Sequence, residues 1–259
     1  MSDIAPVDET PLPARREIGG APHTAEPGTQ ALAAALPALG LFERLAAIRA
    51  HVSSRIVFTT SFGLEDQAIT HAIFSQSLAI DVATLDTGRL FPETHEVWAA
   101  TEQRYSHRIA AFAPAHESLE ALMAQHGIGG LKSSLTARLE CCNVRKVAPL
   151  GRALAGRAAW ITGIRAEQSA GRAQLSAVAF DERHRLVKVN PLFDWTRAQT
   201  LDFVRAHAVP YNRLHDRGFL SIGCAPCTRA VAPGEPERAG RWWWEQSDKK
   251  ECGLHSEAS

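Results

Sequence analysis

The chain of 259 residues is long enough to bury the core of one large α/β domain. Its 28 basic and 28 acidic side chains cancel, which argues against nonspecific binding to nucleic acid or to an anionic membrane surface. No stretch approaches the roughly 18 continuous apolar residues of a membrane span, and the Pro- and Ala-rich N-terminus has no apolar core like that of a signal peptide. We therefore expect a cytoplasmic protein whose residues 1–30 form a disordered leader.

Strand and helix patterns alternate from residue 31 onward. The expected elements are a helix over 31–51 interrupted at Pro37, a strand over 55–60, a helix over 65–77, a strand over 80–85, a helix beginning near Pro92, a strand over 107–112, helices over 115–126 and 141–154, a strand over 158–162, a hairpin over 174–189 and a helix over 196–207. This order predicts an α/β fold in which helices flank a parallel sheet. From Gly218 onward the sequence predicts an irregular tail. We expect one domain over 31–217 and a C-terminal segment over 218–259.

Three loops should meet at the carboxyl edge of this sheet, where open parallel sheets bind their ligands. They begin at Ser61, Asp86 and Gly163. Backbone N–H groups at a helix start beside the Ser61 hydroxyl suit a phosphate or sulfate, although an ordinary capped turn has the same pattern. The glycines and arginines from Gly163 to Arg172 suit close approach to a nucleotide, or a plain surface loop.

The five cysteines divide into four and one. Cys141 and Cys142 are adjacent, Cys224 and Cys227 form a C-x-x-C pair, and Cys252 stands alone. Four thiolates are the ligand set of a [4Fe–4S] cluster and also of a structural zinc site. A directly adjacent pair fits the tetrahedral geometry of zinc less easily, which favours the cluster.

Basic residues accompany both cysteine pairs. On a helix, Arg145 and Lys146 would lie four residues beyond the adjacent cysteines, where they could offset the charge of a cluster and still face an anionic substrate. Arg238 and Arg241 are three residues apart, so one helical turn would let both guanidinium groups bind one sulfate or phosphate. The tryptophans at 242–244 should dock the tail against the body, since exposing three of them is costly.

Cys252 has the surroundings of a nucleophile. Lys249, Lys250 and His255 are cationic neighbours in the sequence, and such neighbours lower the pKa of a thiol and favour the thiolate. An incidental surface cysteine is the alternative, but its place in this tail favours a reactive role.

In combination, these motifs resemble the assimilatory adenylyl-sulfate reductases, the iron–sulfur type of the PAPS/APS reductase family. The resemblance runs from about Arg55 to His255 and is carried by both cysteine pairs, by Arg238-Ala-Gly-Arg241 before three tryptophans, and by Glu251-Cys-Gly-Leu-His255. The 3′-phosphoadenylyl-sulfate reductases share the fold and the last motif but typically lack the four cluster cysteines. The Ser61 loop also resembles the pyrophosphate loop of the adenine nucleotide α-hydrolases, except that Phe62 replaces a glycine, which argues against ATP cleavage.

The resemblance implies an adenine nucleotide α-hydrolase-like fold and the reduction of adenosine 5′-phosphosulfate to sulfite and AMP, in sulfate assimilation and cysteine biosynthesis. Thioredoxin or glutaredoxin would act on a thiosulfonate formed at Cys252. The implied site residues are the ligands Cys141, Cys142, Cys224 and Cys227 of one [4Fe–4S] cluster, the phosphosulfate contacts Lys146, Arg238, Arg241 and His255, and the nucleotide contacts Ser61, Leu85, Gly163 and Arg172. A 3′-phosphoadenylyl-sulfate reductase, an ATP-dependent thiolase or ligase and a zinc-stabilised binding module are the alternatives, and a homo-oligomer is compatible with the sequence.

Overall fold

The computed structural model describes residues 27–245, 251 and 253–254. Two helices precede the sheet, α1 (Pro27–Ala35) and α2 (Leu41–His51), with a 3₁₀ turn over Leu36–Ala38 between them. The turn contains Pro37, which has no N–H for a helical hydrogen bond, so the helix breaks at the expected place. Helix α1 begins within the range predicted as a leader, and residues 1–26 of that range lie outside the described part.

Six strands form one sheet, in the spatial order β3-β2-β1-β4-β6-β5. They are β1 (Ile56–Thr60), β2 (Asp81–Leu85), β3 (Ala110–Phe112), β4 (Ala159–Ile161), β5 (Val178–Asp181) and β6 (Leu186–Val189). All neighbouring pairs are parallel except β5 and β6, which form the expected hairpin at one edge. The predicted parallel sheet flanked by helices is therefore confirmed, with one antiparallel edge strand.

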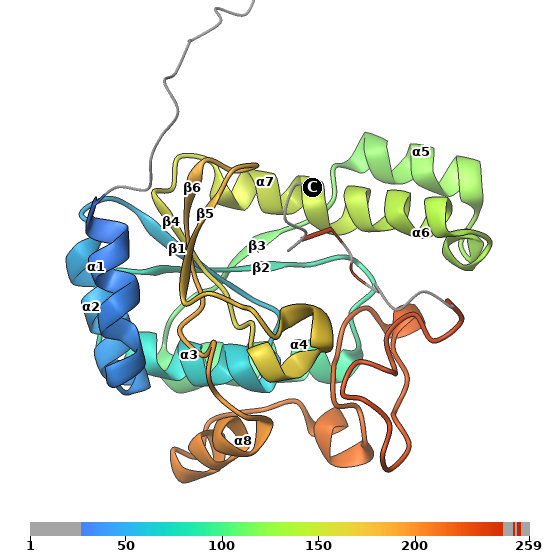
Figure 1. Cartoon of the computed structure of the whole chain (residues 1–259). Helices are drawn as coiled ribbons and strands as arrows, with labels where there is room; N and C mark the ends of the chain where they lie inside the picture. Colours follow the sequence, from blue (N-terminus) through green and yellow to red (C-terminus); the bar gives the residue numbers. More distant parts are fainter. Residues whose placement is uncertain (1–26, 246–250, 252, 255–259) are drawn as a thin grey trace, which may run out of the picture.

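Helices cover both faces of the sheet (Figure 1). The remaining helices are α3 (Leu64–Ser75), α4 (Pro92–Tyr105), α5 (His116–His126), α6 (Leu135–Cys142), α7 (Ala148–Leu154) and α8 (Arg197–Ala206). Successive residues of β1 point to opposite faces. Ile56 and Phe58 pack in the core shared with α3, whereas Val57 packs with Leu150 and Leu154 of α7.

The segment predicted as one helix over 141–154 is more complex. It begins earlier, at Leu135, because the Ser134 hydroxyl caps the helix by accepting from the Ala137 N–H at 3.1 Å. Between α6 and α7 the backbone is π-helical over Asn143–Val147. Pro149 lies two residues beyond this stretch, and its missing N–H leaves the carbonyl of Arg145 without a helical partner, which accounts for the widened turn.

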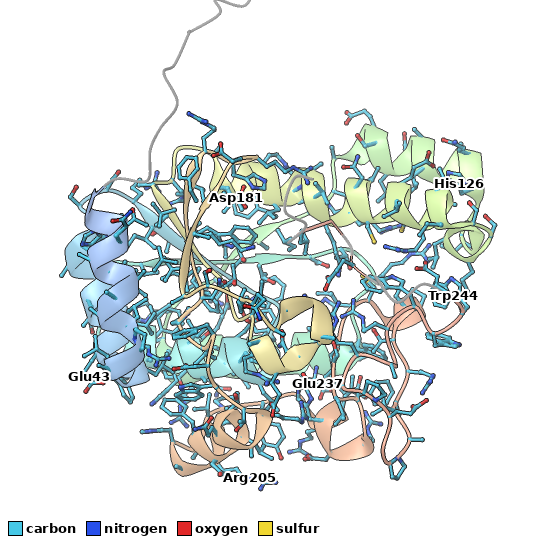
Figure 2. All side chains as sticks on the ribbon, viewed as in Figure 1. Glu43, His126, Asp181, Arg205, Glu237 and Trp244 are labelled. Atoms are coloured by element: carbon cyan, nitrogen blue, oxygen red, sulfur yellow. The ribbon has the colours of Figure 1, made fainter. Side chains whose placement is uncertain are left out.

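The irregular tail packs against the body. An isolated bridge pairs Thr228 with Arg241, and the Trp242 N–H donates to the Cys227 carbonyl at 3.1 Å. Trp242 is buried, whereas Trp243 is exposed. Trp244 lies beside the connection between α5 and α6 (Figure 2), where the Lys132 Nζ is 5.1 Å from its ring centre. The predicted docking of the tail is thus confirmed for Trp242, while the division of the chain at residue 217 stays a prediction.

Among the described helices, none is long and apolar enough to cross a membrane.

Candidate functional site

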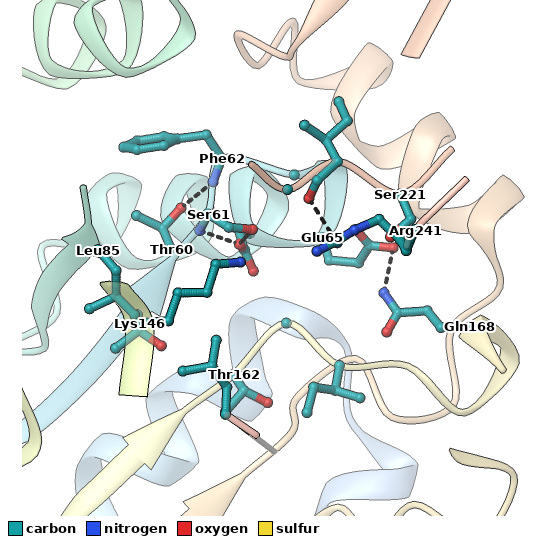
Figure 3. A pocket seen from close by; sticks show the side chains of 18 of the residues that line it. Thr60, Ser61, Phe62, Glu65, Leu85, Lys146, Thr162, Gln168, Ser221 and Arg241 are labelled. Atoms are coloured by element: carbon teal, nitrogen blue, oxygen red, sulfur yellow. Dashed lines mark hydrogen bonds between the residues drawn. The ribbon is translucent and has the colours of Figure 1, made fainter. Parts of the chain in front are cut away.

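A cavity of about 190 Å³ opens at the carboxyl edge of the sheet, beside the point between β1 and β4 where the strand order reverses. Figure 3 shows side chains around it. Seven residues with predicted substrate contacts line this cavity: Ser61, Leu85, Lys146, Gly163, Arg172, Arg238 and Arg241. The three strand-end loops therefore border one cavity, as the strand order predicts. Cys252 and His255 lie outside the described residues, and their roles stay predictions.

The Ser61 loop holds an internal carboxylate. Asp66, in the first turn of α3, accepts hydrogen bonds from the Ser61 N–H at 2.5 Å and from the Ser61 hydroxyl at 2.7 Å. Burial raises the pKa of Asp66 to about 7, although the Ser61 hydrogen bonds act in the opposite direction. Two of the donors at this turn are thus taken by a side chain of the protein itself, whereas no side chain caps the start of α3 at Gly63.

Phe62 adopts a left-handed backbone conformation, with φ of 60°. This conformation suits the glycine of the pyrophosphate-loop pattern and is strained for a bulky residue. The ring is fully buried and stacks on Trp98, with the ring centres 5.5 Å apart. Burial of the ring therefore offsets the backbone strain, and the loop keeps its turn without the glycine.

Gly163 allows the loop after β4 to approach α3 closely. A Cβ at this position would lie 2.1 Å from the Asp66 Oδ1 and 3.2 Å from the Glu65 Cβ. Two residues on, the guanidinium of the fully buried Arg165 binds Glu65 at 2.7 Å and Glu237 at 3.0 Å. These ion pairs join the start of α3, the loop after β4 and the C-terminal tail around the cavity.

Four cationic side chains line the cavity and are called its cationic wall: Lys146, Arg172, Arg238 and Arg241. A turn, rather than a helix, brings Arg238 and Arg241 to this wall, and the Arg241 N–H donates to the Arg238 carbonyl at 2.9 Å. The Arg241 guanidinium lies 4.6 Å from the centre of the Trp242 ring. It packs so closely on Gly223 that a Cβ there would lie 2.3 Å from its Nη2. Stacking and close packing thus fix the direction of this side chain.

The described residues next to Cys252 also reach the cavity. Glu251 and Leu254 both line it. The Arg138 guanidinium anchors this segment, because its Nη1 donates to the Glu251 carbonyl at 2.7 Å while its Nε binds Glu245 at 2.7 Å. Described residues on either side of Cys252 therefore border the cavity.

A second, much smaller cavity lies beside the first, and all four paired cysteines line it: Cys141, Cys142, Cys224 and Cys227. Its other lining residues include four cations and no carboxylate: Arg89, Arg138, Arg145 and Lys146. Lys146 lines both cavities and so connects the thiol cluster with the candidate substrate pocket.

The thiols influence one another electrostatically. Burial and the nearby Cys224 raise the pKa of Cys227 to about 11. Burial acts in the same direction on Cys224, but Lys146 and the Thr87 hydroxyl outweigh it and lower the pKa of that thiol. Four thiolates in so small a space would repel one another, so full deprotonation requires a positively charged partner.

Hydrogen-bond donors surround the thiols. Within the described part of the chain, the buried Arg145 Nε, Arg241 Nε and Trp242 Nε1 find no acceptor. Arg145 is held beside the thiols because its Nη1 donates to the Thr87 carbonyl at 2.6 Å. A tetrathiolate group with sulfur acceptors fits these donors and the four cations that line the thiol cavity. Over the same residues, no three His, Cys, Asp or Glu side chains are arranged to hold a single metal ion.

Sequence reasoning missed several residues of the site. Asp66 follows the Ser61 loop directly, and its position in that motif was an available signal. The pairings of Arg138 with Glu245 and of Arg165 with Glu237 join residues 107 and 72 positions apart. No local sequence pattern indicates contacts between residues so far apart in the chain.

Comparison with known proteins identifies the family. Residues 55–230 match the phosphoadenosine phosphosulfate reductase domain. An adenosine 5′-phosphosulfate reductase of Agrobacterium fabrum is 50% identical over 88% of this chain and 87% of its own length. One of Allochromatium vinosum is 51% identical over 77% of this chain and 78% of its own.

A solved structure gives the same fold. A phosphoadenylyl-sulfate reductase from Candida auris, in a phosphate complex, superposes with a TM-score of 0.68 at 27% identity. The alignment covers 82% of this chain and 100% of that one. The sheet order and these matches show an adenine nucleotide α-hydrolase-like fold. With more than half of its length matched by the domain and relatives at about 50% identity, this chain belongs to the phosphoadenosine phosphosulfate reductase family.

Proposed function

We propose that this chain reduces adenosine 5′-phosphosulfate to sulfite and AMP in assimilatory sulfate reduction. The observation that carries the proposal is the cavity at the strand-order reversal, which four cationic side chains line and which lies beside a cavity lined by four thiols. The 50% identity to adenosine 5′-phosphosulfate reductases over most of the chain supports the same activity.

The residues around the cavity suit both ends of this substrate. Asp66 occupies the Ser61 N–H and hydroxyl, so the nucleoside fits the Ser61 loop better than an anion does. Leu85 and Gly163 line the same cavity and would contact the nucleotide. Lys146 and Arg241 line the cavity and would bind the phosphosulfate oxygens together with Arg238 and His255. Arg172, expected from the sequence to contact the nucleotide, would join them, because it shares the Glu251 carboxylate with Arg238.

The proposed chemistry begins with the Cys252 thiolate. It attacks the sulfur of the substrate, a bond forms between the Cys252 Sγ and that sulfur, and the bond from sulfur to the bridging phosphate oxygen breaks. AMP leaves with the electron pair, and Cys252 holds a thiosulfonate. Lys146, Arg238 and Arg241 stabilise the charge that grows on the departing phosphate oxygens.

A dithiol protein completes the reaction. One of its thiolates attacks the Cys252 Sγ and sulfite leaves, which gives a mixed disulfide. Its second thiol then restores the Cys252 thiol and leaves the partner as a disulfide, so the partner supplies the two electrons. Thioredoxin or glutaredoxin fits this role, and such a reaction belongs in the cytoplasm, where thiols are kept reduced.

The four paired cysteines would hold one [4Fe–4S] cluster. Their common cavity, its cations and the N–H donors without acceptors among the described residues support this assignment. A [4Fe–4S] cluster requires its thiolate ligands to be farther apart than a single metal ion does, because each thiolate binds a different iron atom. When bound, the cluster would supply a fixed charge beside Lys146 that helps to orient this side chain.

The alternatives are less well supported. Cleavage of ATP by a thiolase or ligase needs a loop that binds pyrophosphate, and in this loop Asp66 occupies the Ser61 N–H and hydroxyl. A 3′-phosphoadenylyl-sulfate reductase would be expected to lack the four cysteines that line the second cavity.

Anaerobic purification followed by three assays tests the proposal. We expect about four irons and four acid-labile sulfides per chain, sulfite release from adenosine 5′-phosphosulfate with thioredoxin, and much slower release from the 3′-phosphorylated nucleotide. Zinc without sulfide would contradict the cluster. Equal or faster turnover of the 3′-phosphorylated substrate, or pyrophosphate release from ATP, would contradict the activity.

A further inference from the structure

The Glu251 side chain binds two arginines of the cationic wall at once. Its Oε1 lies 2.9 Å from the Arg172 Nη2, and its Oε2 lies 3.1 Å from the Arg238 Nη2. Each carboxylate oxygen thus has its own guanidinium, as two oxygens of a bound phosphate or sulfonate would have. The carboxylate also borders the cavity.

This contact differs from the permanent anchor of the tail. Arg138 and Glu245 form a pair whose side chains are only 2% and 10% exposed. The side chains of Glu251, Arg172 and Arg238 are 35%, 12% and 16% exposed, so this contact is more open to solvent than the anchor and exchanges more readily. The Arg138 Nη1 holds the Glu251 backbone by its carbonyl, so the side chain can leave the arginines while the backbone stays attached.

We propose that the Glu251 carboxylate is an internal counter-ion that occupies Arg172 and Arg238 until the oxyanion of the substrate displaces it. The inference rests on the proposed function only for the identity of that oxyanion. Displacement frees both guanidinium groups for the substrate. It also releases the side chain adjacent to Cys252 at the moment when the substrate arrives, which couples binding to the position of the tail.

The direction in which anion affinity changes when the Glu251 charge is removed separates a counter-ion from a purely structural ion pair. A purely structural ion pair would leave anion binding unchanged or weaken it when removed. An internal competitor must strengthen anion binding when its charge is removed. We expect Glu251→Gln to lower the Kd of inorganic sulfate about fivefold, which corresponds to about 1 kcal/mol. Glu251→Asp, whose shorter side chain cannot span both arginines, should show a smaller gain in the same direction.

Isothermal titration of the full-length holoprotein with inorganic sulfate, and separately with AMP, makes the measurement. Glu235→Gln is the matched control, because Glu235 pairs with Arg229 away from the cavity and its side chain is 34% exposed. The Glu251→Gln gain should be lost when Arg172→Gln and Arg238→Gln are both present. Unchanged or weaker sulfate binding in both Glu251 variants, or a gain that persists without the arginines, would overturn the inference.

The two ligands separate the inference from the proposed function. Tighter sulfate binding by Glu251→Gln with no AMP binding by any variant would support the counter-ion and count against the nucleotide substrate. Normal AMP binding by the wild type with no gain from either Glu251 variant would overturn the counter-ion and leave the proposed function intact.

Discussion

Asp66 shows how one side chain can change what a loop binds. In this chain its carboxylate accepts from both the N–H and the hydroxyl of Ser61. The loop therefore keeps the turn of a pyrophosphate loop while its Ser61 N–H and hydroxyl are already satisfied. Phe62 and Gly163 preserve the backbone path around this contact, the first by burying its ring and the second by having no Cβ.

The raised pKa of Asp66 predicts a pH-dependent stability. The folded state keeps the proton up to about pH 7, whereas the unfolded chain loses it near pH 4. Between these values the folded state binds more protons, so the free energy of unfolding falls as the pH rises. Urea unfolding at pH 5 and pH 8 should show a larger fall for the wild type than for Asp66→Asn. Because the comparison cancels the titration of other groups, equal falls would contradict the assignment.

Replacing Phe62 by the glycine of the motif should destabilise the protein. Truncating a buried ring costs about 3–5 kcal/mol, and relief of a left-handed backbone returns about 1–2 kcal/mol. We expect Phe62→Gly to lower the free energy of unfolding by about 2 kcal/mol, measured by denaturant titration. It should gain no ATP cleavage, because Asp66 remains in the loop. A more stable variant, or one that releases pyrophosphate from ATP, would refute this view of the loop.

At the scale of elements, the order of strands and helices was predictable because short β-branched and aromatic runs alternate with longer segments of helical spacing. The expected helix break at Pro37 and the start of α4 at Pro92 follow from the missing N–H of proline. The early start of α6 and the π-helical turn after Cys142 were not foreseen. The first depends on a single serine cap and the second on a local conflict at Pro149, and neither changes the hydrophobic pattern.

The Arg165 ion pairs hold three elements around the cavity, and their loss should lower the free energy of unfolding. Arg165 is fully buried against Glu65 and Glu237. We expect Arg165→Met to lower the free energy of unfolding by about 3–5 kcal/mol, because two carboxylates lose their partner inside the protein. Arg185→Met, which removes the exposed pair with Glu182, is the control and should change it by less than about 1 kcal/mol. A similar loss of free energy of unfolding in both variants would show that the buried pairs do not join these elements.

At the scale of the whole molecule, two cavities that share Lys146 lie side by side, and the four paired cysteines line the smaller one. Strand topology alone predicts that the three loops meet, since the carboxyl ends of parallel strands share an edge. The meeting of Cys141 and Cys142 with Cys224 and Cys227 could be expected only from their chemistry, because about 80 residues separate the pairs and no periodicity relates them. The sequence places Lys146 four residues beyond Cys142, where we expected it to face both a cluster and an anionic substrate, and in the structure it lines both cavities.

The proposed account assigns four cysteines to the cluster and the fifth to the substrate. Intact-protein mass spectrometry of the holoprotein, after anaerobic exposure to adenosine 5′-phosphosulfate without reductant, tests this division most directly. The account predicts one added sulfonate per chain, on the peptide that contains Cys252, which thioredoxin removes and which Cys252→Ser lacks while keeping its iron and sulfide. A wild-type protein without the adduct, or a Cys252→Ser variant that still releases sulfite, would contradict it.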